Sequence, residues 1–339
     1  SKEGNKMEKS KKSIFSSLKW RWEYFLVLLL ILEFVIFGSL NPRFLNPFIL
    51  MNSINNFIPV CIVSLLVTYV IITGGMDIQA GSIMGLTSIC VGVLWQKMGL
   101  NIWLAVLLGL LVGALCGLIS GMLIAYAKVQ PMVITLGGSF LYSGLSLVVP
   151  ALAGVVAYQG ITNFPPEFQE IAAGNIAGIP NQVIIFAALL ILSFILLHLT
   201  KYGRKIFLIG VNRNTAEYSG IKTARVVMST YVLSGIAASI SGILLTPYLG
   251  TAKPDFGADL TLPIITAVVL GGTSIYGGKG NVIGTGLAAL IIGFMKFGLT
   301  LIGVNAQYQD IPVGILLILS LIINFMIHSK VFQKIMKKK

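Results

Sequence analysis

The chain has 339 residues, of which 56% are apolar and only 10% are charged, and its mean hydropathy is +0.92. Soluble proteins carry about 25% charged residues, which cover their surface in water. This composition argues against a soluble enzyme, a disordered scaffold and a nucleic-acid-binding protein, and it indicates an integral membrane protein.

Basic residues outnumber acidic residues by 24 to 11, which gives a formal net charge of +13. Most of the basic residues fall in three segments, each next to a long apolar run: 1–23, 201–225 and 330–339. Positive charge collects in the cytoplasmic loops of membrane proteins. We therefore expect all three segments to be cytoplasmic, which places both termini on the same side and makes the number of crossings even.

Ten apolar runs predict helices that cross a membrane, since a crossing takes about 20 apolar residues. In chain order they cover about 24–40, 56–73, 81–96, 101–126, 131–150, 180–200, 226–248, 260–272, 281–299 and 311–327. The run 260–272 is short for a full crossing, so it is expected either to be partly re-entrant or to extend at one end.

The predicted fold is therefore all-α, a polytopic membrane bundle of about ten transmembrane helices with both termini cytoplasmic. The predicted transmembrane core covers 24–327, between a basic N-terminal segment (1–23) and a basic tail (328–339). Within the core, the longest outer loop is expected at 151–179 and the main cytoplasmic loop at 201–225.

Four of the 37 glycines recur every four residues in one apolar run, at Gly109, Gly113, Gly117 and Gly121. This spacing places them on one helix face and allows the backbone of another helix to approach closely. Two interpretations stay open: packing between helices of this chain, or a face for a partner subunit.

Two sequence patterns look like ligand-binding motifs, but neither matches its motif fully. The turn 272–280 resembles a phosphate-binding loop, but Thr273 stands where that motif needs Gly, and Gly280 stands where it needs Ser or Thr. The spacing of Cys61, Cys90 and Cys116 fits no metal motif. We expect no cofactor and no metal.

Two carboxylates fall inside the predicted bilayer, where a charge is costly. Glu33 lies in the middle of the first run and is expected to be protonated or to lie at a helix interface. Asp77 follows the Gly74-Gly75 break, and it either caps a helix that begins near Ile78 or lies beside a transport pathway. Two such groups far apart in sequence do not form the relay that a proton-coupled carrier needs.

The basic loop 201–225 contains the pattern of a short helix over about 215–219. Asn214 is expected to cap its start together with Glu217, and Gly220 is expected to end it. A short helix on the inner face is suited to docking a soluble partner, although it can also be no more than a structured loop.

This loop resembles a motif of the permeases of monosaccharide-type ATP-binding-cassette (ABC) importers. The matching residues are Gly210, Asn212, Ala216, Ser219, Gly220 and Ile221. Three further segments resemble the same family: Thr73–Ser82, Val133–Gly137 and Ala267–Gly280. We expect the resemblance to extend over the chain from about residue 24 to 327.

The resemblance implies a non-catalytic permease subunit of the bacterial cytoplasmic membrane. Its partners would be a second, sister permease, two cytoplasmic ATP-binding subunits and an extracytoplasmic solute-binding protein received by loop 151–179. The residues of the coupling helix, which would dock to the ATP-binding subunit, are Asn214, Thr215, Ala216, Glu217, Tyr218, Ser219 and Gly220.

Within the family, the chain looks most like the autoinducer-2 importer branch, which implies a small hydroxylated solute; ribose or another monosaccharide is the alternative. Candidates for the translocation path are Asn55, Asn56, Asp77, Gln79, Ser82, Ser139 and Tyr142. Gln79 departs from the small or hydroxyl residue that many relatives carry, which leaves substrate preference open. Two other classes remain as alternatives: a gradient-driven secondary transporter and a membrane scaffold.

Overall fold

The computed structural model describes residues 22–328, so the predictions for 1–21 and 329–339 lie outside the described residues. The described helices are α2 (Trp22–Leu40), α3 (Pro47–Ile72), α4 (Ala80–Gln96), α5 (Ile102–Ala125), α6 (Pro131–Leu152), α7 (Pro166–Ala173), α8 (Asn181–Phe194), α9 (Lys201–Val211), α10 (Arg213–Tyr218), α11 (Thr223–Leu249), α12 (Thr261–Leu270), α13 (Val282–Leu301) and α14 (Asp310–His328). Short 3-10 turns are η1 (Pro42–Leu45), η2 (Ala157–Gln159) and η4 (Ala306–Tyr308), and η3 (Ile195–Leu199) continues α8 as a π-helical turn.

Each of the ten predicted apolar runs forms a helix, which confirms the all-α prediction. Seven described helices are long and apolar enough to cross a membrane: α2, α3, α5, α6, α8 with η3, α11 and α13. The helices α4 and α12 and the described apolar part of α14 are shorter. About ten crossings therefore stays a prediction.

Short polar residues begin several of these helices. Asn46 Oδ1 accepts hydrogen bonds from the backbone of Phe48 and Ile49 at the start of α3, where Pro47 takes the first position. Asn101 Oδ1 does the same for α5. These side chains satisfy N–H groups that a helix start leaves unpaired, and proline at the first position has no N–H to satisfy.

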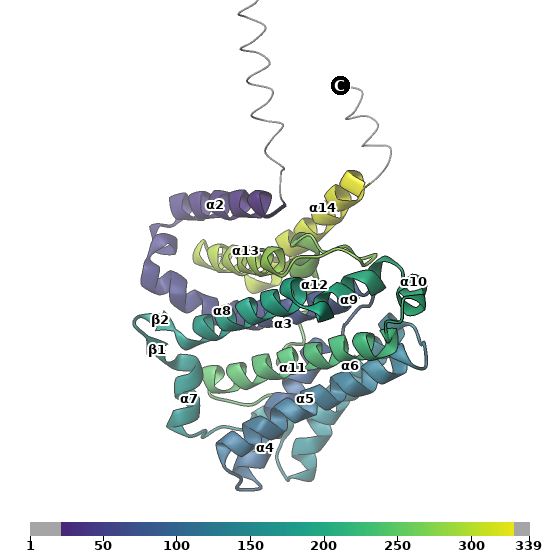
Figure 1. Ribbon diagram of the computed structural model, residues 1–339. Helices are drawn as coiled ribbons and strands as arrows, with labels where there is room; N and C mark the ends of the chain where they lie inside the picture. The colour runs from purple at the N-terminus through teal and green to yellow at the C-terminus, as the bar shows by residue number, and fades with distance from the viewer. Residues whose placement is uncertain (1–21, 329–339) are drawn as a thin grey trace, which may run out of the picture.

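The helices lie side by side, and the connecting elements gather at the two ends of the bundle (Figure 1). One end carries α7 and a hairpin of two-residue strands, β1 (Asn175–Ile176) with β2 (Ile179–Pro180), which fall within the predicted outer loop 151–179 except for Pro180. The opposite end carries α10, and both the beginning of α2 and the end of α14 lie there (Figure 1). The described chain thus enters and leaves at the end that carries α10.

Contacts around the end of α12 tie it to α2 and α3. Trp22 Nε1 donates to the carbonyl oxygen of Leu270 at 2.7 Å, which joins the start of α2 to the end of α12. The N–H of Gly278 donates to the carbonyl oxygen of Ile72 at 2.8 Å, which joins the following turn to the end of α3.

The glycine face of α5 packs against α11 of the same chain. A Cβ atom at Gly117 would overlap the carbonyl oxygen of Tyr231, and one at Gly113 would overlap the hydroxyl of Ser239. The structure therefore assigns this face to packing within the chain, where a small residue lets two helix backbones approach.

The two longest helices, α3 and α11, are each followed by a non-helical segment, 73–79 and 251–260, and then by a shorter helix. The turns of 251–260 pack against the first residues of α4, where Gly81 and Gly257 lie so close that a Cβ on either would meet the backbone of the other. Backbone polar groups inside a bilayer must find partners within the protein. The break before α4 is therefore where side-chain hydrogen bonds should gather.

Candidate functional site

Asp77 lies in the break between α3 and α4 and is almost fully buried. Its Oδ2 accepts a hydrogen bond from Ser234 Oγ of α11 at 2.6 Å, and its Oδ1 accepts one from the backbone N–H of Gln79 at 3.1 Å. The helix starts at Ala80 rather than near Ile78 as expected. Asp77 therefore closes the turn before the helix and joins that turn to α11.

The neighbouring carbonyl group of Met76 is held by side chains of α6 and α11. It accepts from Thr135 Oγ1 of α6 at 3.3 Å and from the hydroxyl of Tyr231 of α11 at 3.4 Å. The extended segment is thus held from both sides, which satisfies backbone groups that lipid cannot.

Gln79 is fully buried beside this turn. Its Oε1 accepts from Ser120 Oγ of α5 at 2.8 Å, and its Nε2 has no hydrogen-bond partner among the described residues. The hydroxyl of Tyr142 lies 3.4 Å from Ser120 Oγ and donates to the carbonyl oxygen of Cys116 at 3.0 Å. The cluster therefore contains a buried amide group whose N–H donors have no acceptor among the described residues.

A second group of hydroxyls forms a row of serines between α4 and α6. Ser82 Oγ lies 3.0 Å from Ser139 Oγ, and Ser143 Oγ donates to Ser82 Oγ at 2.9 Å. The row opens into a crevice of about 230 Å³. Its walls include Gly81, Ser82, Ser143, Ser146, Leu147, Tyr158, Pro254, Asp255, Phe256 and Ala258.

The chemistry of this crevice fits a small solute with several hydroxyl groups. Serine and tyrosine hydroxyls both donate and accept, and the exposed carboxylate of Asp255 accepts. Because none of these walls carries a positive charge, an anionic solute has no counter-charge in the crevice.

The structure brings together five of the seven predicted path residues: Asp77, Gln79, Ser82, Ser139 and Tyr142. It does not bring Asn55 and Asn56 to them. Asn56 Oδ1 accepts from the hydroxyl of Tyr248 near the end of α11 at 2.9 Å, and Asn55 is buried with its Oδ1 unpaired among the described residues.

Several residues of the cluster were not predicted from the sequence. Ser143 and Ser146 follow Ser139 at intervals that place all three on one side of α6, so their pattern was visible. Ser120 and Ser234 belong to distant helices, and no local pattern pointed to them.

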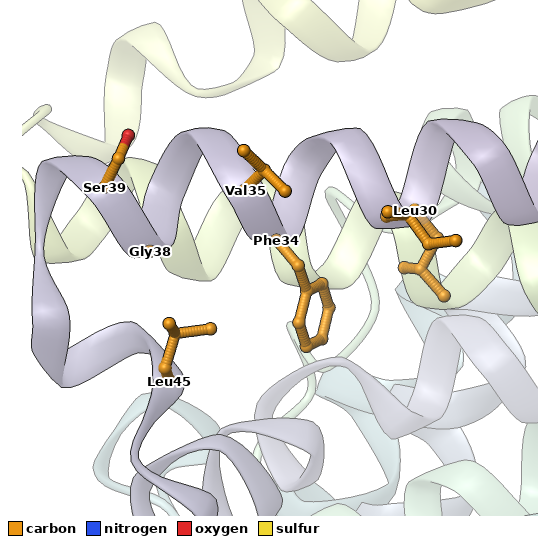
Figure 2. A pocket seen from close by; sticks show the side chains of 7 residues that line it. Leu30, Phe34, Val35, Gly38, Ser39 and Leu45 are labelled. Carbon is orange, nitrogen blue, oxygen red and sulfur yellow. The ribbon is translucent and has the colours of Figure 1, made fainter.

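Two other cavities lie away from the polar crevice. The larger, about 500 Å³, lies between α2 and the chain that follows it, where Figure 2 shows Leu30, Phe34 and Leu45 around it. The other, about 290 Å³, lies between α2, α13 and α14 and includes Glu33, which is 7% exposed with both carboxyl oxygens unbonded among the described residues. Apart from Glu33 and Ser39 their walls are apolar, which suits lipid chains rather than a hydroxylated solute.

At the opposite end from α7, the cytoplasmic-loop prediction needs one correction. The short helix α10 begins at Arg213, and its cap is Asn212, whose Oδ1 accepts from the N–H of Thr215 at 3.0 Å. The predicted cap, Asn214, lies inside the helix. The predicted end is confirmed, since Gly220 has a φ of +82° and follows the last turn.

The short helix is held through its first residue and its buried side, and its last residue is exposed. Ala216 is buried, whereas Tyr218 is 93% exposed. Arg213 Nη2 donates to the carbonyl oxygen of Ala125 at 3.1 Å. The amphipathic helix α9 before it was not predicted; its buried face includes Ile206 and Ile209.

A bundle of apolar helices with a hydroxyl-lined crevice and a displayed short helix defines a membrane transport permease. The chain belongs to the family described as the permease component of the branched-chain amino acid transport system, which matches residues 49–321. It is thus a multi-pass permease subunit of an ABC importer of the bacterial inner membrane.

Particular relatives carry the name autoinducer 2 import system permease protein LsrD. Those from Escherichia coli (strain SMS-3-5 / SECEC), Escherichia coli (strain K12) and Shigella flexneri are each 44% identical to this chain over 301 residues, which is 89% of this chain and 91% of the relative. No solved structure matches the chain.

Proposed function

We propose that this chain forms one half of the path by which an ABC importer brings autoinducer-2 into the cell. The observation that carries the proposal is the serine row of Ser82, Ser139 and Ser143, of which Ser82 and Ser143 line the polar crevice. The name of the relatives supports autoinducer-2 as the solute. Ribose or another monosaccharide is the alternative, because its hydroxyl groups can use the same donors and acceptors.

The solute crosses by exchanging hydrogen bonds with sparse hydroxyl groups. Each serine can donate to or accept from the solute in turn, so no single position holds it tightly. Asp77 does not bind the solute in this scheme. It keeps the break before α4 in place through Ser234.

The energy comes from partner subunits, and this chain has no catalytic role and needs no cofactor. Two cytoplasmic ATP-binding subunits serve a pair of permeases, of which the second is a different sister chain. The helix α10 docks into the ATP-binding subunit. This places 201–225 and both termini in the cytoplasm, with about ten crossings between them.

A solute-binding protein delivers the solute at the other end. The outer segment 151–179 forms the docking surface for the solute-binding protein. Its helix α7 carries Glu167 and Glu170 on the exposed side. Fixed negative charge there favours one orientation of a partner that carries a basic patch.

Reconstitution into vesicles tests the proposal. The complex of this chain, its sister permease and the ATP-binding subunits should take up labelled autoinducer-2 only with ATP and the solute-binding protein present. Excess unlabelled autoinducer-2 should abolish this uptake, and excess ribose should not. ATP-dependent uptake of ribose alone would contradict autoinducer-2 as the solute but would still support an ABC importer. Uptake without the ATP-binding subunits that an uncoupler abolishes would favour a secondary transporter.

A further inference from the structure

The glycine-rich turn between α12 and α13 displays an aromatic side chain. Tyr276 is 87% exposed at its tip. The turn is closed by two backbone hydrogen bonds, from Ser274 N to the Lys279 carbonyl oxygen and from Gly277 N to the Ser274 carbonyl oxygen, each 3.0 Å. Gly277 and Gly278 both have positive φ, +84° and +74°, a conformation that favours glycine. The turn is therefore a shaped loop that holds Tyr276 outward.

Close backbone contacts join this turn to the segment that precedes α10. A Cβ atom at Gly210 would overlap the backbone of Gly278, and one at Gly278 would lie 2.9 Å from the side chain of Val211. Val211 is the last residue of α9, and the next residue, Asn212, caps α10. The turn and the short helix thus belong to one continuous surface.

This surface gathers large apolar side chains that the described residues leave uncovered. They are Leu208, Val211, Tyr218 and Tyr276. Exposed basic groups, Arg204 and Lys205, flank them on α9. Exposed aromatic side chains on a rigid support are typical of the residues that carry binding energy in protein interfaces.

We propose that the turn 273–280, with Tyr276 at its tip, is a second docking point for the ATP-binding subunit beside α10. The inference rests on the proposed function, in which that subunit already contacts α10, and continuity of the surface identifies the occupant. Contacts at both α10 and the turn would resist rotation of the ATP-binding subunit on the permease. Contact through the six-residue helix alone would not.

The second contact also has its own route into the bundle. The N–H of Gly278 donates to the carbonyl oxygen of Ile72 at 2.8 Å, the last residue of α3. The extended segment with Asp77 begins at the next residue. A displacement of the turn is therefore transmitted through the end of α3 to the break before α4. The helix α10 has a different connection, to α5 through Arg213.

Site-specific photo-crosslinking in the assembled complex tests the contact. The substitution Tyr276→p-benzoylphenylalanine should give an adduct with the ATP-binding subunit. The same substitution at Tyr308, an exposed tyrosine between α13 and α14 at the other end, should give none. An adduct with lipid alone, which a tyrosine at the membrane interface would give, or no adduct at all, overturns the proposal.

Transport assays distinguish the proposed docking at Tyr276 from the proposed docking at α10, on which it rests. Tyr276→Ala should lower uptake per ATP hydrolysed about five-fold or more, Tyr276→Phe should retain most of it, and Tyr308→Ala should leave it unchanged. If Ala216→Trp lowers ATP-dependent uptake while Tyr276→Ala does not, the second docking point is wrong and the proposed importer function stands. If neither variant changes ATP-dependent uptake, docking through α10 fails as well.

Discussion

Arg213, the first residue of α10, donates a hydrogen bond to the carbonyl oxygen of Ala125, the last residue of α5, over 3.1 Å. The final carbonyl groups of a helix have no partner within it, and a positive charge there interacts well with the helix dipole. Since α5 packs along α11 through its glycine face, a displacement of α10 reaches two helices at the centre of the bundle.

Removing this bond should loosen α10 from the bundle without unfolding the chain. For Arg213→Ala we expect a loss of about 1 kcal/mol, because the pair is only partly buried, together with several-fold less solute imported per ATP hydrolysed. Arg213→Lys keeps the charge and should lose less. Parallel assays of uptake and ATP hydrolysis measure the ratio, and an unchanged ratio in the alanine variant would show that α10 does not act through α5.

The packing of α5 on α11 can be tested with two matched glycines. Gly117→Ala should destabilise the protein by about 1–3 kcal/mol, because its new methyl group meets the backbone of Tyr231. Gly137→Ala in α6 should change little, because no atom lies within 4 Å of the added Cβ. Thermal unfolding of the purified complex compares them. Equal transition temperatures would contradict the packing described.

The break before α4 depends on Asp77. For Asp77→Ala we expect a loss of about 1–3 kcal/mol, because two buried donors lose their acceptor. Ser234→Ala should cost less, since Asp77 then keeps the N–H of Gln79. In a double-mutant cycle the two losses should fail to add. Strict additivity would mean that the two side chains do not interact.

The crevice gives a prediction about transport alone. Ser143→Leu puts a bulky apolar group into the serine row, so uptake should fall at least ten-fold while the unfolding temperature is retained. Ser39→Leu is the matched control, because Ser39 is an exposed serine of α2 beside an apolar cavity (Figure 2). Normal uptake by the Ser143 variant would exclude this crevice from the path.

The apolar runs predicted the helices well because long stretches without charge have few other stable forms in a membrane protein. Gly220 was predicted equally well, since a glycine after a short polar helix favours the left-handed conformation that ends it. The cap was misplaced by two residues. Asn212 and Asn214 are equally good caps, and the choice falls to Asn212 because α9 runs to Val211 and the chain turns there.

The candidate site was predictable only where its residues share an element. Ser139 and Tyr142 lie on α6, and Asp77, Gln79 and Ser82 fall within a few residues of one another, so local patterns identified them. The bond from Ser234 to Asp77 joins positions 157 residues apart. Such a partner depends on which helices pack together. Composition and periodicity around a single residue do not reveal that.

The most direct measurement is simultaneous uptake and ATP hydrolysis in vesicles that contain the complete importer, with wild-type chain and with Ala216→Trp. Ala216 lies on the buried side of α10, so a tryptophan there must displace the helix from the residues on which it packs. We predict that the variant inserts and assembles normally, while uptake and solute-stimulated ATP hydrolysis both fall about ten-fold or more. Full ATP-driven uptake with α10 displaced, or replaced by a flexible linker, would contradict the coupling of this bundle to its ATP-binding partner.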